Sequence, residues 1–219
     1  MNIIMDSKDK RNLTPEQCND WWEKAIAKGY FDKWSKGHLT VPRLYAKIPL
    51  NKNSEILEIG CGHGRQLTYF MDHYKNVYGI DVSKTVIEIA RKNCSNAIIR
   101  TYDGVNIPYS DNTFDFVTSV FVLQHMKKEQ AKILLEESLR VLKEGGYFLH
   151  EFAGGIHIAG KGKENFQSIG QEGIYNNSYT FEEIKKLFKE LNLNVQWIEE
   201  INMSKWTPNA TNIWVCVKK

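Results

Sequence analysis

The chain has 219 residues, of which 42% are hydrophobic and 25% are charged, with 29 basic residues against 26 acidic ones. A chain of this length buries enough apolar surface to fold without a disulfide or metal staple, and a single domain is the simplest expectation. The net charge of +3 is spread along the chain, which does not favour a dedicated nucleic-acid binder, and the composition excludes disorder, collagen and coiled coil as descriptions of the whole chain.

The cysteine pattern and the N-terminus bear on location. The four cysteines are far apart and form no C-x-x-C pair, so neither a zinc site nor a redox motif is expected. Residues 1–11 are polar and charged rather than typical of a signal segment, and no apolar run approaches the ~18 residues of a membrane span. These features predict a cytoplasmic protein with no metal and no membrane partner.

The first 50 residues are predicted to form a helical segment. Residues 14–17 read Thr-Pro-Glu-Gln, a helix start with a hydroxyl cap and a proline at the first helical position. This helix is expected to run to about Lys28, and a short helix is expected around residues 41–48.

Residues 51–152 alternate short apolar strands with amphipathic helices. This alternation predicts βαβ units, and therefore a parallel sheet with right-handed crossovers. Strands are expected at 55–59, 77–81, 97–100, 114–122 and 147–152, and helices at 65–73, 83–92 and 129–142.

The segment 153–179 interrupts this rhythm. It holds six of the 15 glycines and exceeds the length of normal connectors, so a mobile loop or lid is predicted. A capping box at 180–183 then begins a helix that ends near Leu191, and two strands are expected at 195–201 and 212–217. No repeat or domain linker is visible, so residues 1–219 are predicted to form one domain.

The sharpest functional signal is the run Glu-Ile-Gly-Cys-Gly-His-Gly at residues 58–64, between a predicted strand and a predicted helix. Glycines allow the backbone to approach a ligand closely, and the start of the helix offers free N–H groups. Asp81 follows Gly60 by 21 residues, at the end of the next strand, where a carboxylate can accept from both hydroxyls of a ribose. The dinucleotide fingerprint G-x-G-x-x-G fails at Arg65, and the phosphate-loop motif is absent.

The E-x-G-x-G-x-G pattern and three later motifs resemble the class I S-adenosylmethionine-dependent methyltransferases, from about Trp34 onward. The later motifs are Tyr-Asp-Gly at 102–104, Phe-Asp-Phe-Val at 114–117 and Leu-Lys-Glu-Gly-Gly at 142–146. The resemblance implies a Rossmann-like α/β fold. Its doubly wound, seven-stranded sheet would be mostly parallel with one antiparallel strand near the C-terminus, helices on both faces and an N-terminal helical cap. It also implies S-adenosyl-L-methionine as the cofactor, S-adenosyl-L-homocysteine as its product, and no metal.

The same resemblance implies a set of cofactor-binding residues. Asp81 matches the ribose-binding carboxylate, and Asp103 matches the acceptor for the adenine amine, with a plain turn as the alternative at Asp103. Arg43 stands where related enzymes bind the methionine carboxylate, with a solvated surface arginine as the alternative. Glu58 is expected to organise the glycine loop through N–H bonds, and Cys61 to be a small filler. The full set is Arg43, Glu58, Gly60, Cys61, Gly62, Gly64, Asp81, Val82, Asp103, Gly104 and Val120.

His125, which follows the fourth strand, is the first candidate for a general base. The family's architecture implies a place near the methyl group, and an unperturbed pKa of ~6.5 suits neutral pH. Packing or capping of the next helix is the alternative. His150 and Glu151 at the end of the fifth strand are second candidates, and His157 can approach the acceptor if its segment closes. Orientation alone can supply ~7–11 kcal/mol, so transfer without a catalytic base is the alternative.

Two regions outside the core are expected to select the acceptor. One is segment 153–179, and the other is a set of aromatic residues that either form an apolar lid or pack the first helix on the sheet: Trp21, Trp22, Tyr30, Phe31 and Trp34. Residues 120–124 lack the Pro-Pro-aromatic motif of base-methylating relatives, so no DNA substrate is expected. We predict a small-molecule acceptor with an oxygen nucleophile. The alternatives are a protein or RNA methyltransferase, a non-catalytic S-adenosylmethionine-binding protein and a nicotinamide oxidoreductase. The oligomeric state is unknown.

Overall fold

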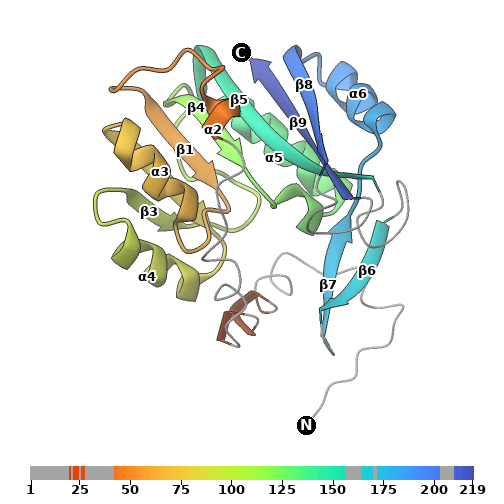
Figure 1. Cartoon of the computed structure of the whole chain (residues 1–219), viewed down its shortest axis with the longest axis horizontal. Helices are drawn as coiled ribbons and strands as arrows, with labels where there is room; N and C mark the ends of the chain where they lie inside the picture. The colour runs from red at the N-terminus through yellow and green to blue at the C-terminus, as the bar shows by residue number, and fades with distance from the viewer. Residues whose placement is uncertain are drawn as a thin grey trace.

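The computed structural model describes residues 20, 22–24, 26–27, 42–155, 164–169, 172–202 and 210–219. Its centre is a seven-stranded sheet in the order β3-β2-β1-β4-β5-β9-β8 (Figure 1). The strands are β1 (Glu55–Ile59), β2 (Asn76–Asp81), β3 (Ile98–Thr101), β4 (Phe114–Ser119), β5 (Leu142–Gly155), β8 (Asn194–Asn202) and β9 (Ala210–Lys218). Only β9 is reversed in this sheet, because it runs antiparallel to both neighbours while the other pairs are parallel. The predicted doubly wound sheet with one antiparallel strand near the C-terminus is therefore confirmed.

Helices cover both faces of the sheet. They are α2 (Pro42–Tyr45), α3 (Arg65–His73), α4 (Lys84–Asn93), the 3-10 turn η3 (Leu123–His125), α5 (Lys128–Val141) and α6 (Phe181–Glu190). Residues of α5 and α6 pack on one face in an apolar cluster around Val117 and Phe148. Residues of α2, α3 and α4 pack on the other face, around Phe116 and Leu149.

The N-terminal caps of two helices form as their sequences predict. The Ser83 side chain accepts from the Val86 N–H at 3.1 Å and begins α4. Thr180 and Glu183 form the reciprocal capping box of α6, with bonds of 3.1 and 2.8 Å. Such caps satisfy N–H groups that have no partner inside the helix.

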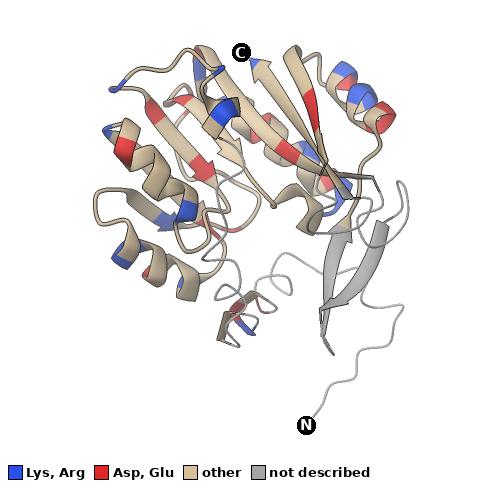
Figure 2. Cartoon of the chain, viewed as in Figure 1, with Lys and Arg blue, Asp and Glu red and all other residues tan. Residues whose placement is uncertain are grey.

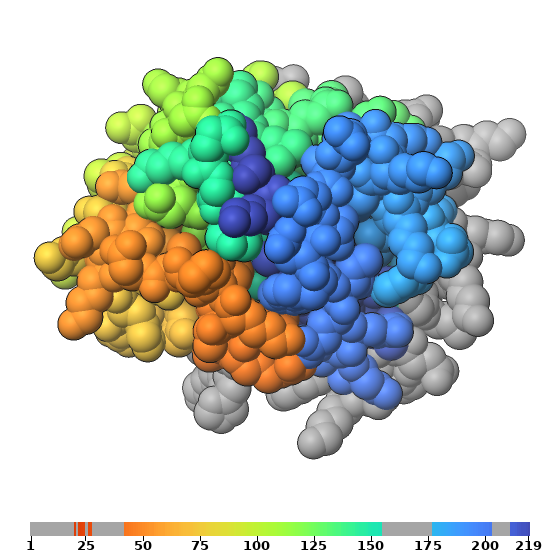
Figure 3. All heavy atoms as spheres, turned by 90° about the horizontal axis from the view of Figure 1, so that it is seen from above, coloured from red at the N-terminus to blue at the C-terminus, as the bar shows by residue number. Residues whose placement is uncertain are grey.

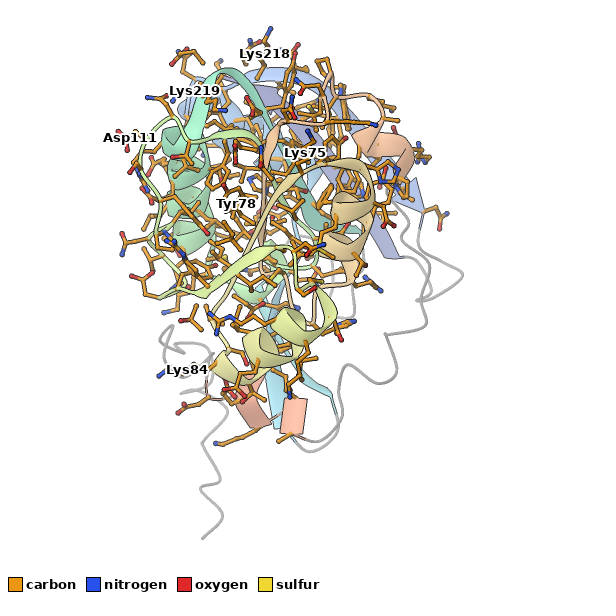
Figure 4. The ribbon with its side chains drawn as sticks, turned by 90° about the vertical axis from the view of Figure 1, so that its left-hand side faces the viewer. Lys75, Tyr78, Lys84, Asp111, Lys218 and Lys219 are labelled. Atoms are coloured by element: carbon orange, nitrogen blue, oxygen red, sulfur yellow. The ribbon has the colours of Figure 1, made fainter. Side chains whose placement is uncertain are left out.

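The parallel strands end at one side of the sheet, here called the carboxyl edge. Figure 4 shows this polarity: Lys84, which begins α4 at the carboxyl edge, lies at the opposite end of the molecule from Lys218 of β9. The chain connections change direction between β1 and β4, which are adjacent in the sheet. In open α/β sheets, ligands bind at the carboxyl edge beside such a switch point.

Two predicted strand ends were wrong, and segment 153–179 contains strands that were not predicted. β4 ends at Ser119 rather than near Val122, because Phe121 has a left-handed backbone with φ of 58°. β5 extends to Gly155 because it pairs with β9 along its whole second half. The predicted lid contains a hairpin of β6 (Glu164–Ile169) and β7 (Glu172–Asn177), which Figure 1 shows beyond the carboxyl edge.

Several predictions fall outside the described residues. They concern the helix start at 14–17, four of the five N-terminal aromatics, residues 156–163 with His157, and residues 170–171. Among the described helices, none has the length and apolar character needed to cross a membrane.

Candidate functional site

The glycine loop joins β1 to α3 at the carboxyl edge. Gly60, Gly62 and Gly64 have φ values of 66°, 55° and 91°, a region that side-chain-bearing residues rarely adopt. A Cβ on Gly60 would lie 2.3 Å from Cγ2 of Val122, and one on Gly64 would lie 2.5 Å from Sγ of Cys94. The protein's own packing therefore requires glycine at two of these positions.

Asp81 at the end of β2 fixes the loop. Its Oδ2 accepts from the Gly62 N–H at 2.9 Å, and its Oδ1 accepts from the Ser83 N–H at 3.0 Å. Burial raises the pKa of Asp81, while these N–H bonds oppose the shift. Each carboxylate oxygen can accept two hydrogen bonds, and the Val82 N–H is a third donor near this carboxylate, so at least one acceptor position remains for a ribose hydroxyl.

The segment after β3 lies beside Asp81, because the Tyr102 N–H donates to the Asp81 carbonyl at 3.1 Å. Asp103 accepts from the Val105 and Asn106 N–H groups at 2.8 and 2.7 Å and from the Asn106 side chain at 2.6 Å. Burial acts to raise its pKa, but these bonds hold the pKa below the usual value. Asp103 therefore builds its own turn, with Gly104 left-handed at φ of 86°.

Glu58 and Cys61 serve the loop differently. The Glu58 carboxyl is buried and accepts from the Gln66 side chain in α3 at 3.2 Å, and burial raises its pKa well above the usual value. Glu58 was expected to accept from N–H groups of the loop. That prediction was wrong for Gly62, whose N–H donates to Asp81 instead. Cys61 is buried and its thiol pKa is also raised by burial, so it is a filler rather than a nucleophile.

Arg43 forms its ion pair away from the β1 end of the sheet. Arg43 and Lys47 both form ion pairs with Glu199 of β8, which is four strands away from β1 in the sheet order. Figure 3 shows the segment around α2 in contact with the segment that contains β8. This exposed ion pair agrees with the alternative of a surface arginine, and the contact with a methionine carboxylate stays a prediction. α2 instead directs Tyr45 inward, where its hydroxyl donates to Gln66.

His125 lies at the carboxyl edge, in η3. Its ring makes an edge-to-face contact with Trp22, with centroids 5.1 Å apart, and its Nε2 is 3.2 Å from Nε2 of Gln124. β7 packs against η3, and the Asn177 side chain donates to the Met126 carbonyl. The N-terminal helical residues and the hairpin thus both meet the turn that carries His125.

His150 lies inside the protein. It is 0% exposed, and its two ring nitrogens lie 2.7 and 3.1 Å from the hydroxyls of Ser119 and Ser138. Burial lowers its pKa to about 3, so it is neutral at physiological pH. Its prediction as a catalytic residue is corrected, because it faces α5 within the core rather than the carboxyl edge.

Two features near these residues were not predicted from the sequence: the left-handed turn at Phe121 and the burial of Asn212. The Phe121 N–H donates to Oε2 of Glu151, whose carboxyl is 1% exposed and whose pKa burial raises to about 8. Asn212 in β9 is also 1% exposed. Asn212 had a visible signal, because it is a polar residue at the head of the apolar run 213–217. The left-handed turn at Phe121 had none.

The structure thus brings the glycine loop, Asp81, Val82, Asp103, Gly104 and Val120 to one edge around the switch point. These residues fit a nucleoside cofactor, since they offer a carboxylate with spare acceptor positions beside a tight glycine turn. Within the described part of the chain, no group of three or more potential metal ligands is present.

Comparisons with known proteins agree with this architecture. The family model "Methyltransferase domain" matches residues 57–150. A crystal structure of an S-adenosylmethionine-dependent methyltransferase from Methanosarcina mazei aligns with a TM-score of 0.71 and 19% identity, covering 83% of this chain and 99% of that one.

Two curated relatives have named acceptors. A tRNA (carboxymethyluridine(34)-5-O)-methyltransferase of Arabidopsis thaliana is 32% identical over 54% of this chain and 27% of its own length. A phosphoethanolamine N-methyltransferase of Plasmodium falciparum is 25% identical over 80% of this chain and 66% of its own. The chain thus spans about a quarter of the first relative. Residues 57–150 thus belong to the methyltransferase domain family, and the sheet order agrees with the fold of the solved S-adenosylmethionine-dependent methyltransferase.

Proposed function

We propose that this chain transfers a methyl group from S-adenosylmethionine to a small-molecule acceptor, with oxygen as the expected nucleophile. The cofactor, when bound, supplies a methyl group already activated on a sulfonium. The observation that carries the proposal is Asp81, which accepts from the Gly62 N–H and still has acceptor capacity for a ribose hydroxyl.

The other residues at the edge have complementary roles in this proposal. The loop Gly60–Gly64 gives the cofactor close access to backbone, and Asp103 with Gly104 forms the wall on the adenine side. His125 is the proposed base. Trp22 and β7 flank His125, so both are positioned to exclude water from the transfer.

Coverage favours a small acceptor. The phosphoethanolamine-methylating relative matches 80% of this chain, including regions outside the core, whereas the tRNA-methylating relative matches 54%. Figure 2 shows basic residues scattered over the helices and interleaved with acidic ones among the described residues. A polyanion such as RNA is bound by a denser basic surface. The expected location remains the cytoplasm.

RNA is the second candidate acceptor. The relatives named as tRNA methyltransferases, in plants, frogs and yeast, are 32% identical to this chain. This chain covers between 18% and 33% of their lengths, so their additional regions have no counterpart in the match.

One experiment separates these candidates. The protein is incubated with methyl-labelled S-adenosylmethionine and extract of the source cell, and the products are fractionated by size. Label in the small-molecule fraction is the expected result. Label only in RNA or protein refutes the small-molecule acceptor and keeps the methyltransferase, and no label in any fraction supports a non-catalytic binding protein.

A further inference from the structure

Two of the buried polar atoms without hydrogen-bond partners lie toward the carboxyl edge of the sheet, one on β5 and one on β9. Oε1 of Glu151 and Oδ1 of Asn212 have no partner in the described part of the chain, and both side chains are 1% exposed. Folded proteins pair nearly all their buried polar atoms, so an unpaired one points to a water, an ion or a ligand group.

The register of the sheet places these two residues together. Across the antiparallel pair, Glu151 faces Trp214 and Ala153 faces Asn212. Glu151 and Asn212 are therefore diagonal neighbours on one face, within reach of each other's side chains. It is the face covered by α2 and α3, since Trp214 belongs to their apolar cluster.

A short chain of contacts links Glu151 to the glycine loop. Its Oε2 accepts from the N–H of Phe121, and the next residue, Val122, occupies the space that a Cβ on Gly60 would need. Oε2 of Glu151 is thus hydrogen-bonded to the left-handed turn after β4. Oε1 of Glu151 remains available to another group at the same edge.

We propose that Glu151 and Asn212 form an acceptor subsite that receives the donor hydrogens of an amino or hydroxyl group on the methyl acceptor. The Asn212 oxygen accepts hydrogen bonds, and a bound ammonium favours the ionised, accepting form of the Glu151 carboxyl, whose pKa burial otherwise raises to about 8. A phosphate or carboxylate brings only acceptors and negative charge to this pair. This inference rests on the proposed function, because the subsite must lie next to the transferred methyl group.

Sinefungin provides a probe that does not require the acceptor to be known. In this analogue an amino-bearing carbon replaces the methylated sulfur, so its amine occupies the position of the methyl group. We expect sinefungin to bind the wild-type protein about tenfold or more tightly than S-adenosylhomocysteine, the scale of one charge-assisted hydrogen bond. Calorimetric titration of the full chain with each ligand gives the ratio.

The Glu151→Gln variant tests the free oxygen specifically. Its amide oxygen still accepts from Phe121, and its NH₂ group replaces the free oxygen with a donor that opposes the amine. We expect this variant to lose the preference for sinefungin while its affinity for S-adenosylhomocysteine stays within about twofold of wild type. Asn212→Leu is expected to reduce the preference in the same direction. Glu200→Gln, at an exposed position of β8, is the matched control and keeps it.

Each result decides the proposal. An equal sinefungin preference in wild type, Glu151→Gln and Asn212→Leu overturns the subsite and leaves the proposed function standing. A parallel loss of both ligands in the two variants assigns Glu151 and Asn212 to structure alone and also overturns it. If the wild-type protein binds neither ligand, the proposed function itself fails and the subsite falls with it.

Discussion

At the scale of single residues, Asp81 anchors the glycine loop, and in the proposed function it also offers acceptor positions to a ribose. Asp81→Ala removes both. We expect a loss of at least ~1.5 kcal/mol in the binding free energy of S-adenosylhomocysteine, about tenfold in affinity, measured by calorimetry. Asp72→Ala, at an exposed position of α3, is the control. An unchanged affinity in Asp81→Ala contradicts the assignment.

His125 gives the second prediction at this scale. If it removes the acceptor's proton, His125→Ala lowers the transfer rate by about 10²-fold or more and leaves the affinity for S-adenosylhomocysteine intact. The rate is followed with labelled cofactor once a methylated product is known. His73→Ala, exposed on α3, is the control. A fully active His125→Ala variant reduces His125 to a packing partner of Trp22.

At the scale of elements, two glycines with similar backbones form a matched pair. Gly60 and Gly145 have φ of 66° and 78°, but a Cβ on Gly60 meets Val122 at 2.3 Å, whereas one on Gly145 meets nothing within 4 Å. Gly145→Ala pays only the left-handed backbone cost of ~1–2 kcal/mol. Gly60→Ala adds a clash, so we expect it to destabilise the protein by a further ~1–3 kcal/mol.

Urea denaturation of both variants measures this difference. Val122→Ala removes the clashing methyl groups, so the double variant Gly60→Ala, Val122→Ala is expected to lose less than the sum of the single variants. Simple additivity of the two substitutions argues against a direct clash between the β1 and β4 ends.

The elements themselves were largely predictable, because their signals are local. Ser83 and Thr180 cap helices through bonds to residues three positions later. Asp81 ends β2, whose short apolar run is visible in the sequence. The site was less predictable where distant segments decide it. Arg43 forms an ion pair with Glu199, and His150 is packed against Ser138 of α5. Both partners are distant in the sequence, so local sequence patterns do not predict these contacts.

At the scale of the whole molecule, the neighbouring buried residues His150 and Glu151 change the folding stability in opposite directions as the pH changes. His150 has a pKa lowered to about 3, so its contribution is present above pH ~6.5 and is lost as the pH falls toward 3. Glu151 has a pKa raised to about 8, so its contribution is present below pH ~4.3 and is lost as the pH rises through 8.

Substitutions separate the two effects. Relative to wild type, Glu151→Gln is expected to gain stability as the pH rises from about 5 to 8, by up to ~1.4 kcal/mol per pH unit. His150→Gln is expected to gain stability relative to wild type as the pH falls from about 6 to 4. Burial also raises the pKa of Glu58, so both variants still lose some folding stability as the pH rises. Denaturant titrations at several pH values test this, and parallel profiles for all three proteins contradict it.

The position of β9 has a consequence for biosynthesis. β9 lies between β5 and β8, although the ribosome makes it after both. As the nascent chain grows, β5 waits with an unpaired edge along much of its 14 residues, and β8 emerges with no strand beside it. Unpaired edges recruit other chains, so this interval is when a chaperone is most useful. The sheet can therefore be completed only after residues 210–218 have been synthesised. Its last strand is inserted between two existing strands rather than added at an edge.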